Sequence, residues 1–118
     1  MPELDPEDAK IVTLAKGARQ RAHVPHTGVA EGAAVRDTDG RTYAAATVEN
    51  ADPALTTSAL RGAIAAAASS GARTFEAAAV VGGSLVSEAD IALLREFGVG
   101  VPLLLADDDG TVHHRIST

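Results

Sequence analysis

Cysteine is absent from this sequence, tryptophan is absent as well, and phenylalanine and tyrosine together contribute three residues among 118. Without cysteine the chain can form no disulfide and no thiolate metal site. Because aromatic side chains make up only 3% of the sequence, the core must be filled by small and β-branched side chains. No run of about 18 apolar residues occurs, which excludes a membrane-spanning helix.

Basic residues are also scarce: Lys and Arg number 10 against 16 Asp and Glu, and the formal net charge is −6. This balance argues against sequence-independent binding of nucleic acid, which needs clustered cationic side chains. The first residues, PELDPEDAK, are acidic and do not resemble a signal peptide. The composition therefore predicts a soluble, cytoplasmic domain over residues 1–118, with neither nucleic acid nor membrane as a partner.

Helix and turn signals in the first half of the chain predict two helices around a hairpin. Asp5-Pro6 reads as a helix start, and apolar residues at helical spacing extend that helix over residues 6–22. Residues 31–49 read as a β-hairpin with Asp39-Gly40 in its turn. Thr56 or Thr57 then caps a helix that runs to Ser70 and stops at Gly71.

The second half alternates strands with one further helix. Residues 74–83 form a strand, Ser87 opens a helix that Gly98 closes, and the apolar run 101–106 is fit for an interior strand. A turn at residues 107–110 leads to a last strand at 111–116. The predicted order is αββαβαββ, an α/β layered domain. The helix 58–70 is apolar nearly all round, which indicates burial on more than one side.

Six pieces of sequence occur in the order found in one enzyme family: HTGVAEGAAV, DGRTY, VENA, SALRGAI, FEAAAVV and LLREFG. From about Ala9 to Leu105 the chain resembles the small, homotetrameric cytidine deaminases. The resemblance implies a three-layer α/β/α fold with a mixed five-stranded sheet. It also implies a zinc-dependent activity on nucleosides, so the residues at the family's metal positions decide what this chain can do.

Those positions are altered. Zinc deaminases hold the metal with one His or Cys, place a catalytic Glu two residues later, and supply two more ligands from Pro-Cys-x-x-Cys. Aligned on VENA, this chain has Ser58 at the first ligand and Leu60 at the catalytic Glu. Ser87 and Asp90 stand at the two later ligands, with Val86 in place of the proline.

The substitutions predict loss of the metal and of the reaction. A serine hydroxyl is a poor zinc ligand, and Asp90 alone offers a single carboxylate. Leu60 transfers no proton, and loss of general acid–base catalysis costs about 10²–10⁴-fold. We therefore expect no zinc or other cofactor and no deaminase activity. A residual cation site at Ser87 and Asp90 is the alternative to a purely structural role.

The same residues have structural explanations. Ser87 and Asp90 form a capping-box-like start for their helix, with Asp90 near its positive end. Ser58 suits a backbone N–H in the first turn of the preceding helix, and Leu60 fills the volume of the lost metal and substrate base. Arg61, which matches an Arg that lies near the subunit contacts of the family, is expected to form an interface ion pair.

The family's substrate contacts survive in part. By resemblance, Thr47 and Glu49 stand where an Asn and a Glu hold the ribose, and Val29 stands where a Phe covers the base. Only the Glu is retained. Glu49 and Asn50 either bind a diol or hydrogen-bond the turn into the next helix, and we favour the second role.

The four histidines give no convincing metal motif. His23 and His26 flank a proline in a loop, while His113 and His114 are adjacent on a strand and so point to opposite faces. All four are expected to face solvent. The segment DDDG lacks the spaced ligands of a calcium loop and is expected to be a turn.

The sequence thus predicts a cytidine deaminase-like protein that has lost catalysis and is kept as a self-assembling scaffold or as the partner of an unidentified protein. A homo-oligomer, either a tetramer or a dimer, is expected because the helix 58–70 is rich in small apolar residues. The first alternative is a module that binds a nucleoside or nucleotide without turnover. The second is a residual hydrolase or an unrelated activity with a recruited metal.

Overall fold

Five strands form one mixed sheet in the order β2-β1-β3-β4-β5 in the computed structural model, which describes residues 4–83 and 86–118. β1 (Gly32–Asp37) and β2 (Thr42–Ala46) are antiparallel, as are β1 and β3 (Phe75–Val81). β3 and β4 (Pro102–Ala106) are parallel, and β5 (Val112–Ser117) pairs antiparallel with β4. This arrangement confirms the predicted sheet and order of elements, with a short 3₁₀ helix, η1 (Pro53–Leu55), added before α2.

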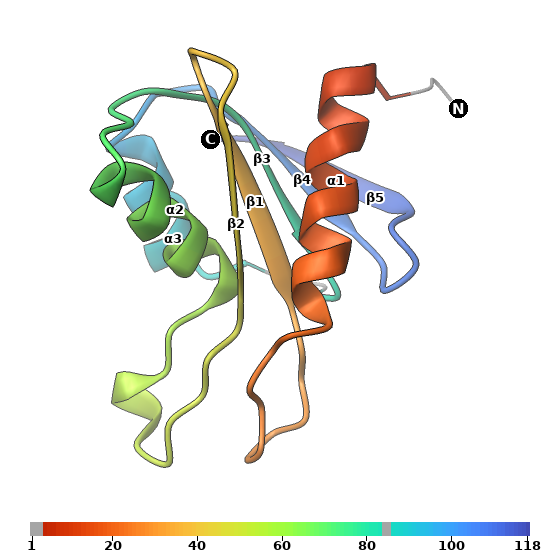
Figure 1. The fold of residues 1–118 in the computed structure, drawn as a ribbon, viewed down its shortest axis with the longest axis vertical. Helices are drawn as coiled ribbons and strands as arrows, with labels where there is room; N and C mark the ends of the chain where they lie inside the picture. The colour runs from red at the N-terminus through yellow and green to blue at the C-terminus, as the bar shows by residue number, and fades with distance from the viewer. Residues whose placement is uncertain (1–3, 84–85) are drawn as a thin grey trace.

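Helices cover both faces of the sheet, which makes three layers (Figure 1). α1 (Pro6–Arg19) lies on one face, and α2 (Ala59–Ser69) and α3 (Glu88–Arg95) lie on the other. α3 connects the two parallel strands, as a crossover helix must. Within the described residues, no helix is long and apolar enough to cross a membrane.

The core is divided by the sheet into two layers of small and aliphatic side chains. Along β4, Leu103 and Leu105 face α2 and α3 whereas Leu104 faces α1, because successive strand residues point to opposite faces. Alanines fill the centre of β1 and β3, and the two phenylalanines, Phe75 and Phe97, stack with their ring centroids 4.8 Å apart. Small and aliphatic side chains thus fill the space between the layers, as the low aromatic content predicted.

Two helices are shorter than predicted. α1 ends at Arg19 instead of residue 22, and α3 ends at Arg95 instead of reaching Gly98. In both cases the last turn tightens: the amides of Arg21 and Phe97 donate to the carbonyls three residues earlier, at 2.9 and 3.0 Å. Apolar spacing alone does not distinguish such a final turn from an α-helix.

The N-cap of α2 also differs from the prediction. Neither Thr56 nor Thr57 caps the helix; Ser58 does, from an extended backbone conformation. Thr57 instead exchanges backbone hydrogen bonds with Val48, and the hydroxyl of Thr56 accepts from the amide of Asn50 at 3.1 Å. Both threonines therefore belong to the connection between β2 and the helix.

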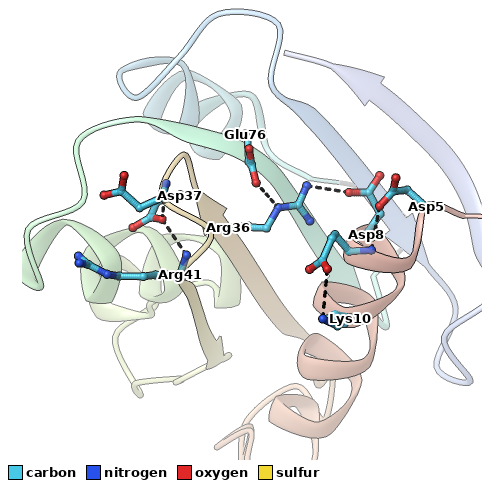
Figure 2. Close-up of polar contacts among 9 residues, drawn as sticks. Asp5, Asp8, Lys10, Arg36, Asp37, Arg41 and Glu76 are labelled. Carbon is cyan, nitrogen blue, oxygen red and sulfur yellow. Dashed lines mark hydrogen bonds and ion pairs between the residues drawn. The ribbon is translucent and has the colours of Figure 1, made fainter.

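A polar network ties the layers together at the hairpin end of the sheet (Figure 2). Arg36 of β1 donates to Asp8 of α1 at 3.0 Å and to Glu76 of β3. Burial opposes the charge of Arg36, but the hydrogen bonds that it donates to Glu76 and Asp8 outweigh this effect and raise its pKa. The buried Asp37 accepts from the amide of Arg41 at 2.9 Å and holds the turn, where Gly40 has the positive φ that the predicted hairpin requires.

A candidate site between two helix starts

The first turns of α2 and α3 meet beside the sheet, and each begins with a serine. The hydroxyl of Ser58 accepts from the amide of Arg61 at 3.2 Å, and that of Ser87 accepts from the amide of Asp90 at 3.1 Å. The predicted capping role of Ser87 is therefore confirmed, and Ser58 accepts a backbone N–H as expected, although it does so as the N-cap and not from within the first turn. Asp90 lies in the first turn of α3, where a negative charge is favourable.

Asp90 does not complete a capping box but turns toward α2. Its Oδ2 accepts a hydrogen bond of 2.6 Å from the hydroxyl of Ser58, so the start of each helix is fixed to the other. The side chain of Asp90 is only 9% exposed, and its other oxygen, Oδ1, lies 3.9 Å from Nε of Arg61. Because the two positions lie 32 residues apart, the sequence pattern did not reveal this contact.

Arg61 finds its acidic partner within the chain. Within the chain its nearest acidic group is Asp90, and the expected ion pair across a subunit interface stays a prediction. At 55% exposure of the arginine side chain and a distance of 3.9 Å, the pair is weak and open to solvent. The structure therefore gives Arg61 a position at the rim of the site.

Leu60 is buried, but it does not fill the site completely. It is 2% exposed and joins the core beneath α2. Beside it remains a cavity of about 240 Å³. The lining comes from the starts of α2 and α3, from β3, and from the residue that precedes β1. It consists of Glu31, Ser58, Leu60, Val80, Val86, Ser87 and Asp90. The expectation that Leu60 converts the whole pocket into core is thus only partly correct.

Glu31 is a site residue that the sequence reading missed. It directly precedes β1, and Thr47 pins its backbone from the neighbouring segment: the amide of Thr47 donates to its carbonyl at 3.0 Å, and its own amide donates to the Thr47 hydroxyl at 3.2 Å. Burial, and then the negative charge of Asp90, raise the pKa of Glu31. The available signal was an acid directly before the buried run Gly32–Val35.

Glu49 is used by a loop and does not line the cavity. Its carboxylate accepts from the amides of His26 and Thr27 at 2.9 and 3.1 Å and from the Thr27 hydroxyl. The hydrogen bond from that hydroxyl is the main reason that the pKa of Glu49 is lowered. Asn50 holds the turn toward α2, as expected, through the amide of Asp52 at 2.9 Å. Glu49 was also expected to hydrogen-bond this turn. That interpretation is wrong, because its partners lie in the loop at His26 and Thr27.

The remaining two positions assigned by resemblance to substrate do not gather around the cavity either. Thr47 is occupied by the backbone of Glu31, and Val29 is 59% exposed on its loop. Of the predicted residues, the structure thus brings Ser58, Leu60, Ser87 and Asp90 together and leaves Val29, Thr47 and Glu49 outside the lining.

The histidines and the acidic turn are separate from this site. His113 lies 3.8 Å from Asp107, which directly follows β4, and residues 107–110 form the predicted turn, closed by a hydrogen bond of 2.8 Å from Gly110 to Asp107. In the parts of the chain that the structure describes, no three His, Cys, Asp or Glu side chains are grouped so as to hold a metal ion.

The sequence and the fold of this chain have close counterparts among known proteins. A family model described as cytidine deaminase-like matches residues 4–110. The chain belongs to the cytidine deaminase-like family. Its match to a curated cytidine deaminase from Sporosarcina psychrophila is 39% identical over 72 residues and covers 61% of this chain, but only 53% of that protein, about half of its length.

Solved cytidine deaminase structures extend the likeness over most of the fold. The enzyme from Burkholderia pseudomallei is 30% identical to this chain. The match covers 92% of this chain and 90% of the Burkholderia chain, with a TM-score of 0.84. The enzyme from Mycobacterium tuberculosis is 30% identical, with 86% and 85% covered and a TM-score of 0.76. The predicted fold class is confirmed by these similarities.

Proposed function

We propose that this family member binds no zinc, does not deaminate cytidine, and acts as a self-assembling scaffold or as the partner of another protein. The observation that carries the proposal is the hydrogen bond of 2.6 Å between the Ser58 hydroxyl and Asp90. It joins two of the three positions that resemblance assigns to the metal. The hydroxyl also caps α2, so it already has both a donor and an acceptor role within the chain.

The chemistry of the donor set supports the same conclusion. A serine hydroxyl is neutral at physiological pH, whereas zinc sites of this kind depend on thiolate or imidazole ligands. Without the metal, no bound water is acidified. Leu60 offers no group to move a proton to a substrate ring, and that loss alone costs about 10²–10⁴-fold in rate. Two separate parts of the family mechanism are therefore missing.

The cavity of about 240 Å³ favours a second candidate, a module that binds a nucleoside without turning it over. Against it stands Glu49, whose two carboxylate oxygens accept hydrogen bonds from its own loop. A thermal-shift series with cytidine, uridine and deoxycytidine separates this candidate from the first. A saturable rise in the unfolding temperature with any of them supports the binding module.

The proposal is tested on protein purified without a histidine tag. Metal content is measured by inductively coupled plasma mass spectrometry, and conversion of cytidine to uridine is followed with and without chelator. We expect metal well below stoichiometry and conversion at the buffer background. About one zinc per chain, or a rate that chelator abolishes, contradicts the proposal and supports a residual hydrolase, the activity that the names of its relatives suggest.

A further inference from the structure

The cavity beside Leu60 combines an apolar floor with polar groups that point in from two sides. Leu60, Val80 and Val86 supply the apolar surface, while Glu31 and Asp90 supply carboxylates from different elements. Small-molecule sites have this character: mostly apolar walls and a few convergent polar groups. A volume of about 240 Å³ equals roughly eight water volumes, enough for a small ring or a branched cation.

Asp90 has one oxygen left for a ligand. Its Oδ2 is taken by Ser58, but Oδ1 accepts no hydrogen bond from the residues that the structure describes. The nearest cationic atom, Nε of Arg61 at 3.9 Å, is too distant for a hydrogen bond.

Glu31 offers a second acceptor from the segment that precedes β1. Thr47 fixes its backbone on both sides, and the carboxylate lies against Gly83, where a β-carbon would collide with it. Among the described residues its carboxylate has no hydrogen-bond or ion-pair partner, and burial and then the negative charge of Asp90 raise its pKa. Two carboxylates that repel each other across a cavity favour a cation between them.

We propose that this cavity binds a small planar organic cation with paired N–H donors, of the amidinium or guanidinium class, between Glu31 and Asp90. Paired N–H donors match carboxylates in geometry and form charge-assisted hydrogen bonds. The guanidinium of Arg61 approaches Asp90 from the rim, so the chain itself places this chemistry next to the site. Binding of a ligand goes beyond a scaffold role. The inference rests on the proposed absence of zinc, because a zinc ion at Asp90 would occupy the oxygen that the ligand needs.

Benzamidine is the probe, and benzamide is its neutral counterpart of nearly the same shape. Both are titrated into the full chain by isothermal calorimetry in the presence of chelator. We expect saturable binding of benzamidine and none of benzamide. Glu31→Gln keeps the shape of the side chain but removes its charge, and is expected to weaken benzamidine binding by about tenfold or more. Glu88→Gln is the matched control, because Glu88 is an exposed acid in the first turn of α3 outside the cavity.

Three outcomes overturn the inference: no saturable benzamidine binding at millimolar concentration, equal binding of benzamide, or equal loss in Glu31→Gln and Glu88→Gln. Asp90→Asn is expected to weaken binding as well, and circular dichroism checks that its helices remain folded. If this variant does not fold, Glu31→Gln decides alone. Zinc measured in the same samples before chelation tests the proposed function separately, since the titration uses metal-free protein whichever result the metal analysis gives.

Discussion

Glu31 places a carboxyl group directly before an interior strand, where it lines the cavity beside Leu60. Burial and the charge of Asp90 both raise its pKa above the ordinary value of 4.5. The protonated form is therefore favoured by folding. Its contribution to stability is fully present below pH 4.5 and is lost as the pH rises through the higher pKa of the folded state.

From this linkage we predict that Glu31→Gln has a higher unfolding temperature than the native chain at pH 7, because glutamine stays neutral and removes the repulsion with Asp90. The difference should shrink as the pH is lowered toward 4.5, where Glu31 takes up its proton. Thermal denaturation followed by circular dichroism across this range measures the effect. Glu88→Gln should show no comparable pH-dependent gain; parallel profiles for the two variants would rule out a strained carboxylate at residue 31.

The residues at the former metal positions allow a reconstruction. Ser58→Cys, Ser87→Cys and Asp90→Cys together should bind about one zinc per chain, because the backbone already brings these positions into contact. Loss of the two serine caps is expected to cost about 0.5–2 kcal/mol each without metal. Metal analysis and zinc-dependent thermal stabilisation measure the result, with a triple alanine variant as the control.

Adding Leu60→Glu to that reconstruction should restore little deamination. The carboxylate introduced at residue 60 is not enough for catalysis. Glu49 is engaged by its loop, and the exposed Val29 leaves the substrate base uncovered. Cytidine turnover comparable to that of an active relative in the quadruple variant would show that the substrate contacts remain competent.

At the scale of elements, the local signals were predictable and the long-range ones were not. Asp5-Pro6 and Ser87 start their helices as predicted, because an N-cap is decided by residues within one turn. Ser58 takes the cap from Thr56 and Thr57 because Thr57 pairs with Val48, a contact between segments nine residues apart that the pattern does not contain.

The same division holds for the site. The altered metal positions could be located by resemblance, whereas their contacts required the fold: Asp90 reaches Ser58 across 32 residues, and Glu49 reaches Thr27 across 22. Glu31 was missed because an acid next to a turn ordinarily faces solvent. Only the fold, which brings Glu31 and Asp90 of α3 to the lining of the same cavity, makes it part of the site.

The loop at residues 23–29 depends on a single carboxylate. Glu49 accepts two backbone amides and one hydroxyl from it, which lowers the pKa of Glu49 below 4.5. Its contribution to loop stability is therefore present above pH 4.5 and is lost as the pH falls through the lower pKa of the folded state.

Glu49→Gln should consequently speed the amide hydrogen exchange of His26 and Thr27 at neutral pH while the core strands stay protected. Mass spectrometry of peptides that cover residues 23–29 measures the change. Asp39→Asn, at the exposed hairpin turn, serves as the charge-matched control. Unchanged exchange in the loop of Glu49→Gln would mean that the backbone pairing of His23 with Thr47 and Glu49 holds the loop without the carboxylate.

On the scale of the whole molecule, α2 has one face packed and one face in water. Ala59, Leu60, Ala63, Ile64 and Ala67 are buried against the sheet. Ala65 and Ala66 are exposed on the outer side, next to Arg61 and Ser69, and Figure 1 shows this helix at the edge of the molecule. The sequence predicted burial on more than one side, and within one chain only one side is buried. A second copy against the outer face would satisfy the prediction, since small side chains allow close helix approach, whereas exposed alanines alone cost little.

We therefore predict that the protein forms a homo-oligomer, a dimer or a tetramer, through the outer face of α2. Light scattering coupled to gel filtration should give a multiple of the 11.9 kDa chain mass. Ala66→Lys places a charge on the exposed face and should reduce the mass to that of one chain while circular dichroism stays native. Ala63→Lys places the same charge in the core and should unfold the protein instead. A monomer mass for the native chain into the micromolar range contradicts the prediction, and an intact oligomer in Ala66→Lys would move the interface away from α2.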